Sequence, residues 1–199
     1  MKILLLFIFF TASLFAISIN ESLLKIHATL VPKIYLMDYK FQDKLKDNTI
    51  SIAIVYKKNE YKDAKKLKTM MENRYQDGIK TYSVNAFLVD YNDLKSTDAN
   101  IYYLFPAEEE KVQAVIKRAN INKALTFSYL KDDLKYGVMI SLNISKKIRP
   151  LLNLEAIRNH NISLRPMLIN ISNIYLINLK SKQKLLKIKG FNSNLVFQV

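Results

Sequence analysis

The chain has 199 residues, of which 50% are hydrophobic and 11% aromatic, and its formal net charge is +14 at pH 7. This length fits one domain of ordinary size with short additional segments, and the hydrophobic content is sufficient for a buried core. The chain contains no cysteine, which excludes disulfides, thiolate metal sites and thiol nucleophiles.

The excess of basic residues has more than one explanation. A basic surface can bind nucleic acid, an anionic membrane or an acidic protein. The lysines are scattered along the chain, however, and Lys, Asn and Ile are all frequent, as in proteins from AT-rich bacterial genomes. No aromatic and basic motif of a known nucleic-acid-binding module is present. We therefore expect no nucleic-acid partner.

Residues 1–16 have the pattern of a secretory signal peptide. Met1 and Lys2 give a short basic start, residues 3–10 are continuously apolar, and smaller residues lead to Ala16. A signal peptide needs an apolar region of roughly 7–15 residues, whereas a transmembrane helix needs about 20. We expect cleavage after Ala16, a periplasmic mature protein and no transmembrane segment in it. An uncleaved membrane anchor is the alternative.

Residues 20–37 are expected to form the first helix, because their apolar positions recur at spacings of three and four. Asn20 can cap its amino end, and Glu21 suits the positive end of the helix dipole. Proline removes a backbone donor, so we expect a bend or restart at Pro32. His27 lies on the apolar side, which favours a hydrogen-bonded core histidine over a metal ligand.

The central part of the chain alternates strands and helices. Residues 50–56 form a nearly continuous β-branched run, typical of a strand covered on both faces. Further strands are predicted at 82–90, 101–105 and 124–129, one helix with the apolar stripe Tyr61, Ala64, Leu67 and Met71, and another helix beginning at Glu108–Glu110. This order predicts an α/β fold, a Rossmann-like three-layer sandwich with a mainly parallel sheet.

The sequence offers no convincing catalytic or cofactor site. No glycine-rich loop precedes a helix, no G-x-S-x-G elbow occurs, and neither histidine has a zinc-binding context. The acidic run at Glu108–Glu110 is explained by the start of a helix, and Asp132–Asp133 by a solvated turn. Ligands of parallel sheets usually bind at the carboxyl ends of the strands, and no phosphate-binding loop lies there. We expect no enzyme activity, no metal and no cofactor.

The stretch from Gly137 to Ser172 has the most distinctive pattern. Two apolar segments around a basic turn at residues 145–147 predict a hairpin added at a sheet edge. Asn153 is expected to cap a short helix, and Ser163 to cap the next one, with Pro166 near its start. These roles are favoured over ligand contacts.

These residues resemble the carboxy-terminal signature of the YfiR/HmsC-like family, also known as domain of unknown function 4154. The resemblance rests on residues 152–156 and 164–168 after the glycine and hairpin, and it extends over roughly residues 20–172. The signature positions are Gly137, Asn153, Ala156, Leu164 and Leu168. They are expected to be structural.

The resemblance implies a non-catalytic periplasmic regulator with a Rossmann-like fold. The best-known member of the family represses a membrane-bound diguanylate cyclase by binding its periplasmic sensor domain, and its release raises cyclic di-GMP and promotes biofilm formation. Other members accompany histidine kinases or TonB-dependent receptors. The cysteines that form disulfides in the best-known member are absent here, so redox control cannot be carried over.

The chain divides into a signal peptide at residues 1–16, an α/β domain at 17–178 and a basic extension at 179–199. No acidic residue follows Glu155, and the extension could form an additional hairpin. Its basic residues could instead bind an acidic sensor domain or anionic headgroups. The candidate partner-binding residues are Lys180, Lys182, Lys184, Lys187 and Lys189.

The preferred hypothesis is a regulator that binds the periplasmic domain of an inner-membrane signalling protein. A second copy of the chain is a further candidate partner. The alternative is a periplasmic solute-binding module for a small molecule, although one lobe of this size is small for a two-lobed clamp.

Overall fold

The computed structural model describes residues 19–160 and 162–176 of the chain. Within these residues a seven-stranded sheet has the order β2-β1-β3-β4-β5-β6-β7. The helices are α1 (Glu21–Tyr35), α2 (Tyr61–Arg74), α3 (Glu109–Ile121), α4 (Leu154–Asn159) and α5 (Pro166–Ile171). The strands are β1 (Thr49–Tyr56), β2 (Ser83–Asp90), β3 (Ile101–Leu104), β4 (Leu125–Ser128), β5 (Ile140–Ile144), β6 (Ile148–Leu152) and β7 (Asn173–Ile174). Short 3-10 helices occur at Gln42–Lys44 (η1), Lys58–Glu60 (η2), Leu94–Ser96 (η3) and Lys131–Tyr136 (η4).

The sheet is mainly parallel, as predicted. Strands β1, β2, β3 and β4 pair in parallel, and β5 joins β4 through the single pair Phe127 and Ile140. The predicted hairpin is present, because β5 and β6 pair antiparallel over five residues each. Strand β7 then pairs in parallel with Leu151 and Leu152 of β6. Pro150 lies just outside the pairing of β6 with β7. Its missing backbone N–H therefore costs the sheet no hydrogen bond.

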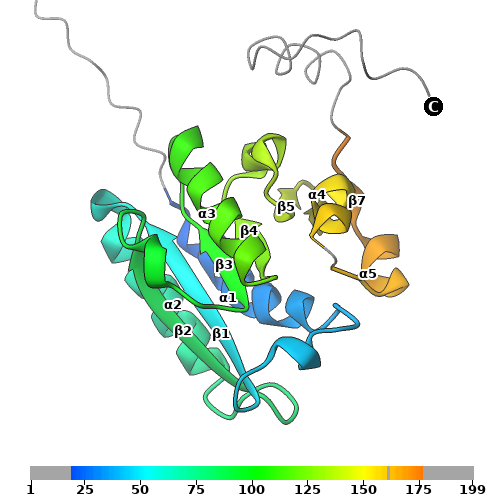
Figure 1. Ribbon diagram of the computed structural model, residues 1–199, viewed down its shortest axis with the longest axis horizontal. Helices are drawn as coiled ribbons and strands as arrows, with labels where there is room; N and C mark the ends of the chain where they lie inside the picture. The colour runs from blue at the N-terminus through cyan, green and yellow to red at the C-terminus, as the bar shows by residue number, and fades with distance from the viewer. Residues whose placement is uncertain (1–18, 161, 177–199) are drawn as a thin grey trace, which may run out of the picture.

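Helices cover both faces of the sheet and make three layers (Figure 1). On one face, Ile52 and Ile54 of β1 belong to a core cluster with the buried residues of α1 and α2. On the other face, Ala53 and Val55 belong to a second cluster with α3. Alternate side chains of one strand point to opposite faces, so the nearly continuous apolar run of β1 supplies both cores. The prediction of a strand covered on both faces is confirmed.

The predicted helices form with two differences. Asn20 caps α1 by accepting a hydrogen bond from the Leu23 N–H at 3.0 Å, and the helix runs through Pro32 without interruption. The expected restart is therefore wrong. Tyr61 was placed on the buried stripe of α2 but is 47% exposed, because the core side of this helix is formed by Ala64, Leu67 and Met71.

His27 is a core residue, as predicted, and is fully buried. The Tyr103 hydroxyl lies 2.6 Å from its Nδ1, while its Nε2 has no hydrogen-bond partner among the described residues. The rings of Tyr103, Phe127 and Tyr129 surround it. Burial in this apolar site lowers the pKa of His27 from 6.5 to about 3.

The prediction of a solvated turn at Asp132–Asp133 is wrong for Asp133. This residue lies in η4 and is 3% exposed. Its carboxylate accepts a hydrogen bond from the Ser128 hydroxyl at 2.5 Å, and burial raises the pKa of the carboxyl group. The run of glutamates behaves as predicted, with Glu109 and Glu110 in the first turn of α3.

Asn153 has the capping role that was predicted, and Ser163 does not. The Asn153 Oδ1 accepts a hydrogen bond from the Ala156 N–H at 3.0 Å, and its Nδ2 donates to the Leu134 carbonyl at 2.9 Å. Helix α5 instead begins after Arg165 with no side-chain cap. The backbone of Ser163 pairs with Asp38 and Tyr39, which holds this segment extended and away from the helix start.

The signature positions are structural, with one backbone requirement. Gly137 ends η4 with a φ of 107°, a left-handed conformation that favours glycine. Ala156, Leu164 and Leu168 are buried. The predicted signal peptide and the basic extension with its five lysines lie outside the described residues. Within the described part of the chain, no helix has both the length and the apolar character needed to cross a bilayer.

We expect Asn153→Ala to lower the free energy of unfolding by about 2 kcal/mol, because it removes a buried cap and leaves a carbonyl without its donor. Ser163→Ala should change the free energy of unfolding by less than about 0.5 kcal/mol, because the Ser163 side chain is exposed and caps no helix. Urea titration of both variants measures this difference. Equal losses of unfolding free energy in the two variants would contradict the assignment of Asn153 as the cap.

The buried His27 predicts a pH dependence of stability. Because its folded pKa lies below its unfolded value, the unfolded state binds the additional proton between pH 6.5 and about 3. Above pH 6.5 His27 is neutral in both states and does not lower the stability. Between pH 6.5 and about 3, each unit of falling pH should lower the free energy of unfolding by about 1.4 kcal/mol. Urea titrations across this range measure the slope. His27→Gln should reduce the slope and His160→Gln should retain it, whereas an unchanged slope in His27→Gln would contradict the assignment.

Candidate functional site

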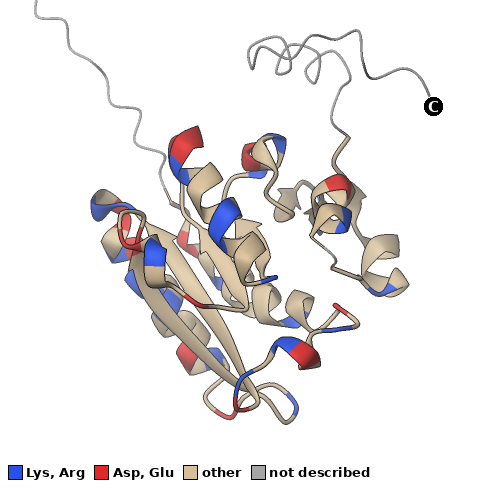
Figure 2. Ribbon diagram, viewed as in Figure 1, with Lys and Arg blue, Asp and Glu red and all other residues tan. Residues whose placement is uncertain are grey.

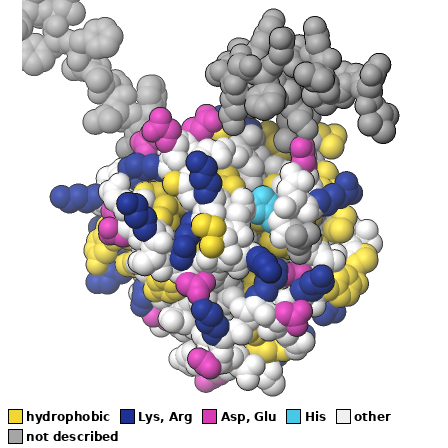
Figure 3. All heavy atoms as spheres, in the orientation of Figure 1, with side chains coloured by type: hydrophobic (Ala, Val, Ile, Leu, Met, Phe, Trp, Pro, Cys, Tyr) yellow, Lys and Arg dark blue, Asp and Glu magenta, His cyan; other side chains and the backbone are white. Residues whose placement is uncertain are grey.

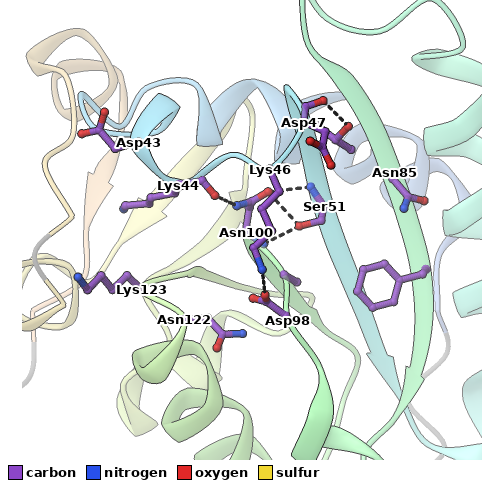
Figure 4. A pocket seen from close by; sticks show the side chains of 13 residues that line it. Asp43, Lys44, Lys46, Asp47, Ser51, Asn85, Asp98, Asn100, Asn122 and Lys123 are labelled. Atoms are coloured by element: carbon purple, nitrogen blue, oxygen red, sulfur yellow. Dashed lines mark hydrogen bonds and ion pairs between the residues drawn. The ribbon is translucent and has the colours of Figure 1, made fainter.

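Two hollows of the described surface lie at the amino ends of the parallel strands. One of about 620 Å³ lies between η1, the start of β1 and the residues before β3 (Figure 4). It is lined by Asp43, Lys44, Lys46, Asp47, Thr49, Ser51, Asn85, Phe87, Asp98, Ala99, Asn100, Asn122 and Lys123. Most of these side chains are polar or charged.

Asn100 organises this hollow and is nearly buried. Its Oδ1 accepts hydrogen bonds from both the backbone N–H and the hydroxyl of Ser51, each at 2.9 Å. Its Nδ2 donates to the Lys44 carbonyl at 2.7 Å. Figure 4 shows Asn100 at the middle of these bonds. The side chain therefore fixes η1 against β1, with both its oxygen and its nitrogen in hydrogen bonds to the protein.

A second hollow of about 620 Å³ adjoins the first, since both are lined by Asp43, Lys44 and Lys123. Its other lining residues are Lys40, Arg158, His160, Ile162 and Ser163. We call the two together the basic groove. Within residues 19–160 and 162–176, the side chains of Lys40, Lys123 and Arg158 form no ion pair. Their positive charges are available to an anion.

The Asp38 carboxylate holds the two walls of the second hollow together. It is 1% exposed, and it pairs with the Lys44 ammonium at 2.6 Å. Its Oδ1 accepts hydrogen bonds from the backbone N–H groups of Lys40 and Ser163 at 3.2 and 3.1 Å. A buried carboxylate needs such partners. The loop after α1 is in this way fixed to the segment before α5.

His160 also lines the groove. Its Nδ1 lies 2.5 Å from the Ala156 carbonyl, which can only accept, so Nδ1 carries the proton. The Nε2 has no hydrogen-bond partner among the described residues. This Nε2 is buried, so it is not exposed to a ligand in the groove.

The second hollow of the groove, with four basic lining residues and one acidic one, is the part that suits a small anion. Lys and Arg are the usual partners of carboxylate and phosphate groups. No group of three or more metal-ligating side chains occurs in the described part of the chain. Figure 2 shows Lys and Arg spread over several elements, so the groove differs from the rest of the surface in its hollow shape rather than in its positive charge.

The carboxyl ends of the strands, where the sequence showed no phosphate-binding loop, carry a different set of contacts. The strand order reverses between β1 and β3, which is where such sheets usually bind ligands. There the Lys57 ammonium pairs with the Glu108 carboxylate at 3.2 Å, and the Lys57 N–H donates to the buried Glu60. Only a smaller hollow of about 440 Å³ remains nearby.

A separate feature is an exposed apolar surface on α5 and β7. Met167 and Ile171 are one helical turn apart and are 61% and 55% exposed. Ile174 and Leu176 extend this surface, and Figure 3 shows apolar side chains over α5 on the right of the molecule. Beside it, the Arg165 guanidinium lies 5.1 Å from the centre of the exposed Tyr39 ring. We call these six residues the α5–β7 surface.

The signature residues named from the sequence support both features without lining either. Asn153 and Ala156 begin α4, which carries Arg158 and His160 to the groove, and Leu168 buries the inner side of α5. Sequence reasoning missed the groove, because its residues come from five separated segments. It also missed the exposed side of α5, for which the only signal was the spacing of Met167 and Ile171.

Comparison with known proteins gives one family and several likenesses to solved structures, among them two remote ones. A family model described as YfiR/HmsC-like (DUF4154) matches residues 41–173. The crystal structure of a conserved domain protein from Vibrio cholerae has a TM-score of 0.54 and 12% identity, over 76% of this chain and 59% of that chain. The ABC domain in complex with L-Trp from Streptococcus pneumoniae has a TM-score of 0.47 and 11% identity, over 72% of this chain and 60% of that one.

The chain thus spans about three fifths of the length of these two solved chains. At such low identity the first likeness shows the α/β fold alone, and the second is too remote for any inference. No protein with a curated description matches the chain.

Proposed function

Because the chain belongs to the YfiR/HmsC-like family, we propose that it binds the periplasmic sensor domain of an inner-membrane signalling protein and regulates its output. Membership supports a periplasmic regulatory role in general. We further propose that the partner is a diguanylate cyclase or a histidine kinase. Binding of the chain would then change the level of cyclic di-GMP or a related signal. In this proposal the chain itself has no catalytic activity.

The observation that supports docking is the α5–β7 surface. Contiguous apolar groups exposed on a folded domain commonly mark protein interaction sites. This surface also carries an arginine and a tyrosine in contact, at 5.1 Å, and both residue types are enriched at the energetic centres of interfaces. An apolar centre with a stacked Arg–Tyr pair at its side fits a partner with an apolar patch near a carboxylate.

We expect the chain to recover such a signalling protein from detergent-solubilised membranes, identified by mass spectrometry. Ile171→Glu and Met167→Glu should each reduce recovery at least tenfold, because a buried unpaired charge opposes association. Ile121→Glu is the matched control, since Ile121 is 72% exposed at the end of α3. Recovery without any cyclase or kinase, or equal losses in the control, would contradict the proposal.

The basic groove supports a second candidate function, the binding of a small anionic solute. Lys123 and Arg158, which form no ion pair with a described residue, line one hollow together with Lys40. In this function the protein is a solute-binding module, and the ligand carries a carboxylate or phosphate group. The two functions are compatible if the solute biases docking of the partner.

We expect inorganic phosphate and citrate, used as probes, to raise the melting temperature of the mature chain, because a ligand that binds only the folded state stabilises it. Arg158→Ala should weaken the apparent affinity about tenfold, as expected for one lost charge-assisted hydrogen bond. Lys111→Ala, beside the smaller hollow, is the control. If both variants respond like the wild type, or neither probe stabilises the protein, the groove is not an anion site.

A further inference from the structure

The hairpin formed by β5 and β6 extends beyond the rest of the described sheet. Strand β4 ends at Ser128 and pairs with β5 only through Phe127 and Ile140. Strand β7 pairs only with the far end of β6, at Leu151 and Leu152. Between these contacts, the hairpin segments from Leu142 to Pro150 pair with each other alone within the described residues. The tip therefore projects as a two-stranded ribbon.

One face of this ribbon stays apolar as it leaves the core. Leu142 is paired with Pro150, and both are buried. The next pair on the same face is Ile144 with Ile148, which lie directly opposite each other and are 54% and 40% exposed. The apolar stripe of the core thus continues outward onto the tip.

The tip is also strongly basic. Residues 144–149 are all exposed, and they include Lys146, Lys147 and Arg149. These three cations form no ion pair with any described residue. No acidic residue occurs between Asp133 and Glu155. The tip therefore combines two exposed aliphatic side chains with three basic residues, and its own sequence contains no acidic residue.

We propose that the β5–β6 tip inserts into the surface of an anionic phospholipid bilayer. Aliphatic side chains gain by entering the apolar boundary of the bilayer, and nearby Lys and Arg are attracted by anionic headgroups. Long basic side chains can bury their stems while their charges stay at headgroup level. An acidic protein partner fits less well, because the tip has no aromatic side chain of the kind that anchors protein interfaces.

Membrane contact of this kind is independent of the signalling partner proposed above. It would hold the chain at the bilayer reversibly, since a small apolar insertion with a few basic residues gives only marginal binding. A regulator confined to the bilayer surface meets an integral membrane protein at a higher local concentration.

The chain has no tryptophan, so a single introduced tryptophan reports the surroundings of the tip. The probe is a lipid vesicle of phosphatidylcholine with or without phosphatidylglycerol, added to the mature chain. Fluorescence of Ile148→Trp should shift to shorter wavelength with the anionic vesicles and not with the neutral ones. Ile121→Trp, an exposed apolar position on α3, should not shift.

Vesicle sedimentation tests the charges. The double variant Lys146→Glu and Lys147→Glu should bind anionic vesicles at least tenfold more weakly than the wild type, and Ile144→Ser should bind severalfold more weakly. Lys62→Glu with Lys65→Glu on α2 is the matched control and should keep most binding. Equal losses in this control would overturn the proposal in favour of attraction by the net charge alone.

Two other outcomes also overturn it. The first is a tryptophan spectrum that does not respond to anionic vesicles. The second is a tip variant that binds vesicles normally but no longer recovers a signalling protein from solubilised membranes, which would make the tip a protein interface. If the variants of the α5–β7 surface still bind the signalling protein, the proposed docking is wrong but the vesicle results still stand. The two proposals can therefore be rejected separately.

Discussion

The burial of β1 and β3 on both faces is the constraint on which the rest of the structure depends. Every side chain of β3 is buried, and β1 is open only at its ends. Alternate side chains therefore need apolar cover on two sides. Helices α1 and α2 supply it on one face and α3 on the other. A two-layer arrangement would leave one of the two apolar faces in water, and burial of apolar surface is the dominant favourable contribution to folding.

Within this frame, buried polar side chains fix the loops at the amino ends of the strands. Asn100 joins η1 to β1, and Asp38 joins the loop after α1 to the segment before α5. Asn153 joins the start of α4 to η4. Because each of these groups is costly to bury without partners, each loop has one favoured position. The basic groove and the α5–β7 surface are held by this set of contacts.

Much of the fold could be predicted from local pattern. The β-branched run of β1, the cap at Asn20 and the helical spacing in α3 are readable from neighbouring residues alone. Predictions failed where a distant partner decides the outcome. Asp133 has lysines on both sides in the sequence, yet Ser128 and burial determine its state. Ser163 has the type of residue that caps a helix, but Asp38 holds its backbone extended.

The candidate sites were less predictable than the fold for the same reason. The groove combines Lys40, Lys123 and Arg158 from three separated segments, and no spacing rule links them. The exposure of Met167 and Ile171 depends on which side of a six-residue helix Leu168 buries. A short helix has too few turns for periodicity to decide this. The five lysines of the extension lie outside the described residues, and their role in partner binding stays a prediction.

The central claim is that the chain regulates a membrane signalling protein by docking through the α5–β7 surface. Hydrogen–deuterium exchange of the mature chain, with and without the purified periplasmic domain of the recovered partner, tests it most directly. The account predicts slower exchange at residues 166–176 and at Tyr39 in the complex, with residues 61–74 of α2 unchanged. Protection confined to other elements, or no protection at a concentration that saturates binding, would contradict it.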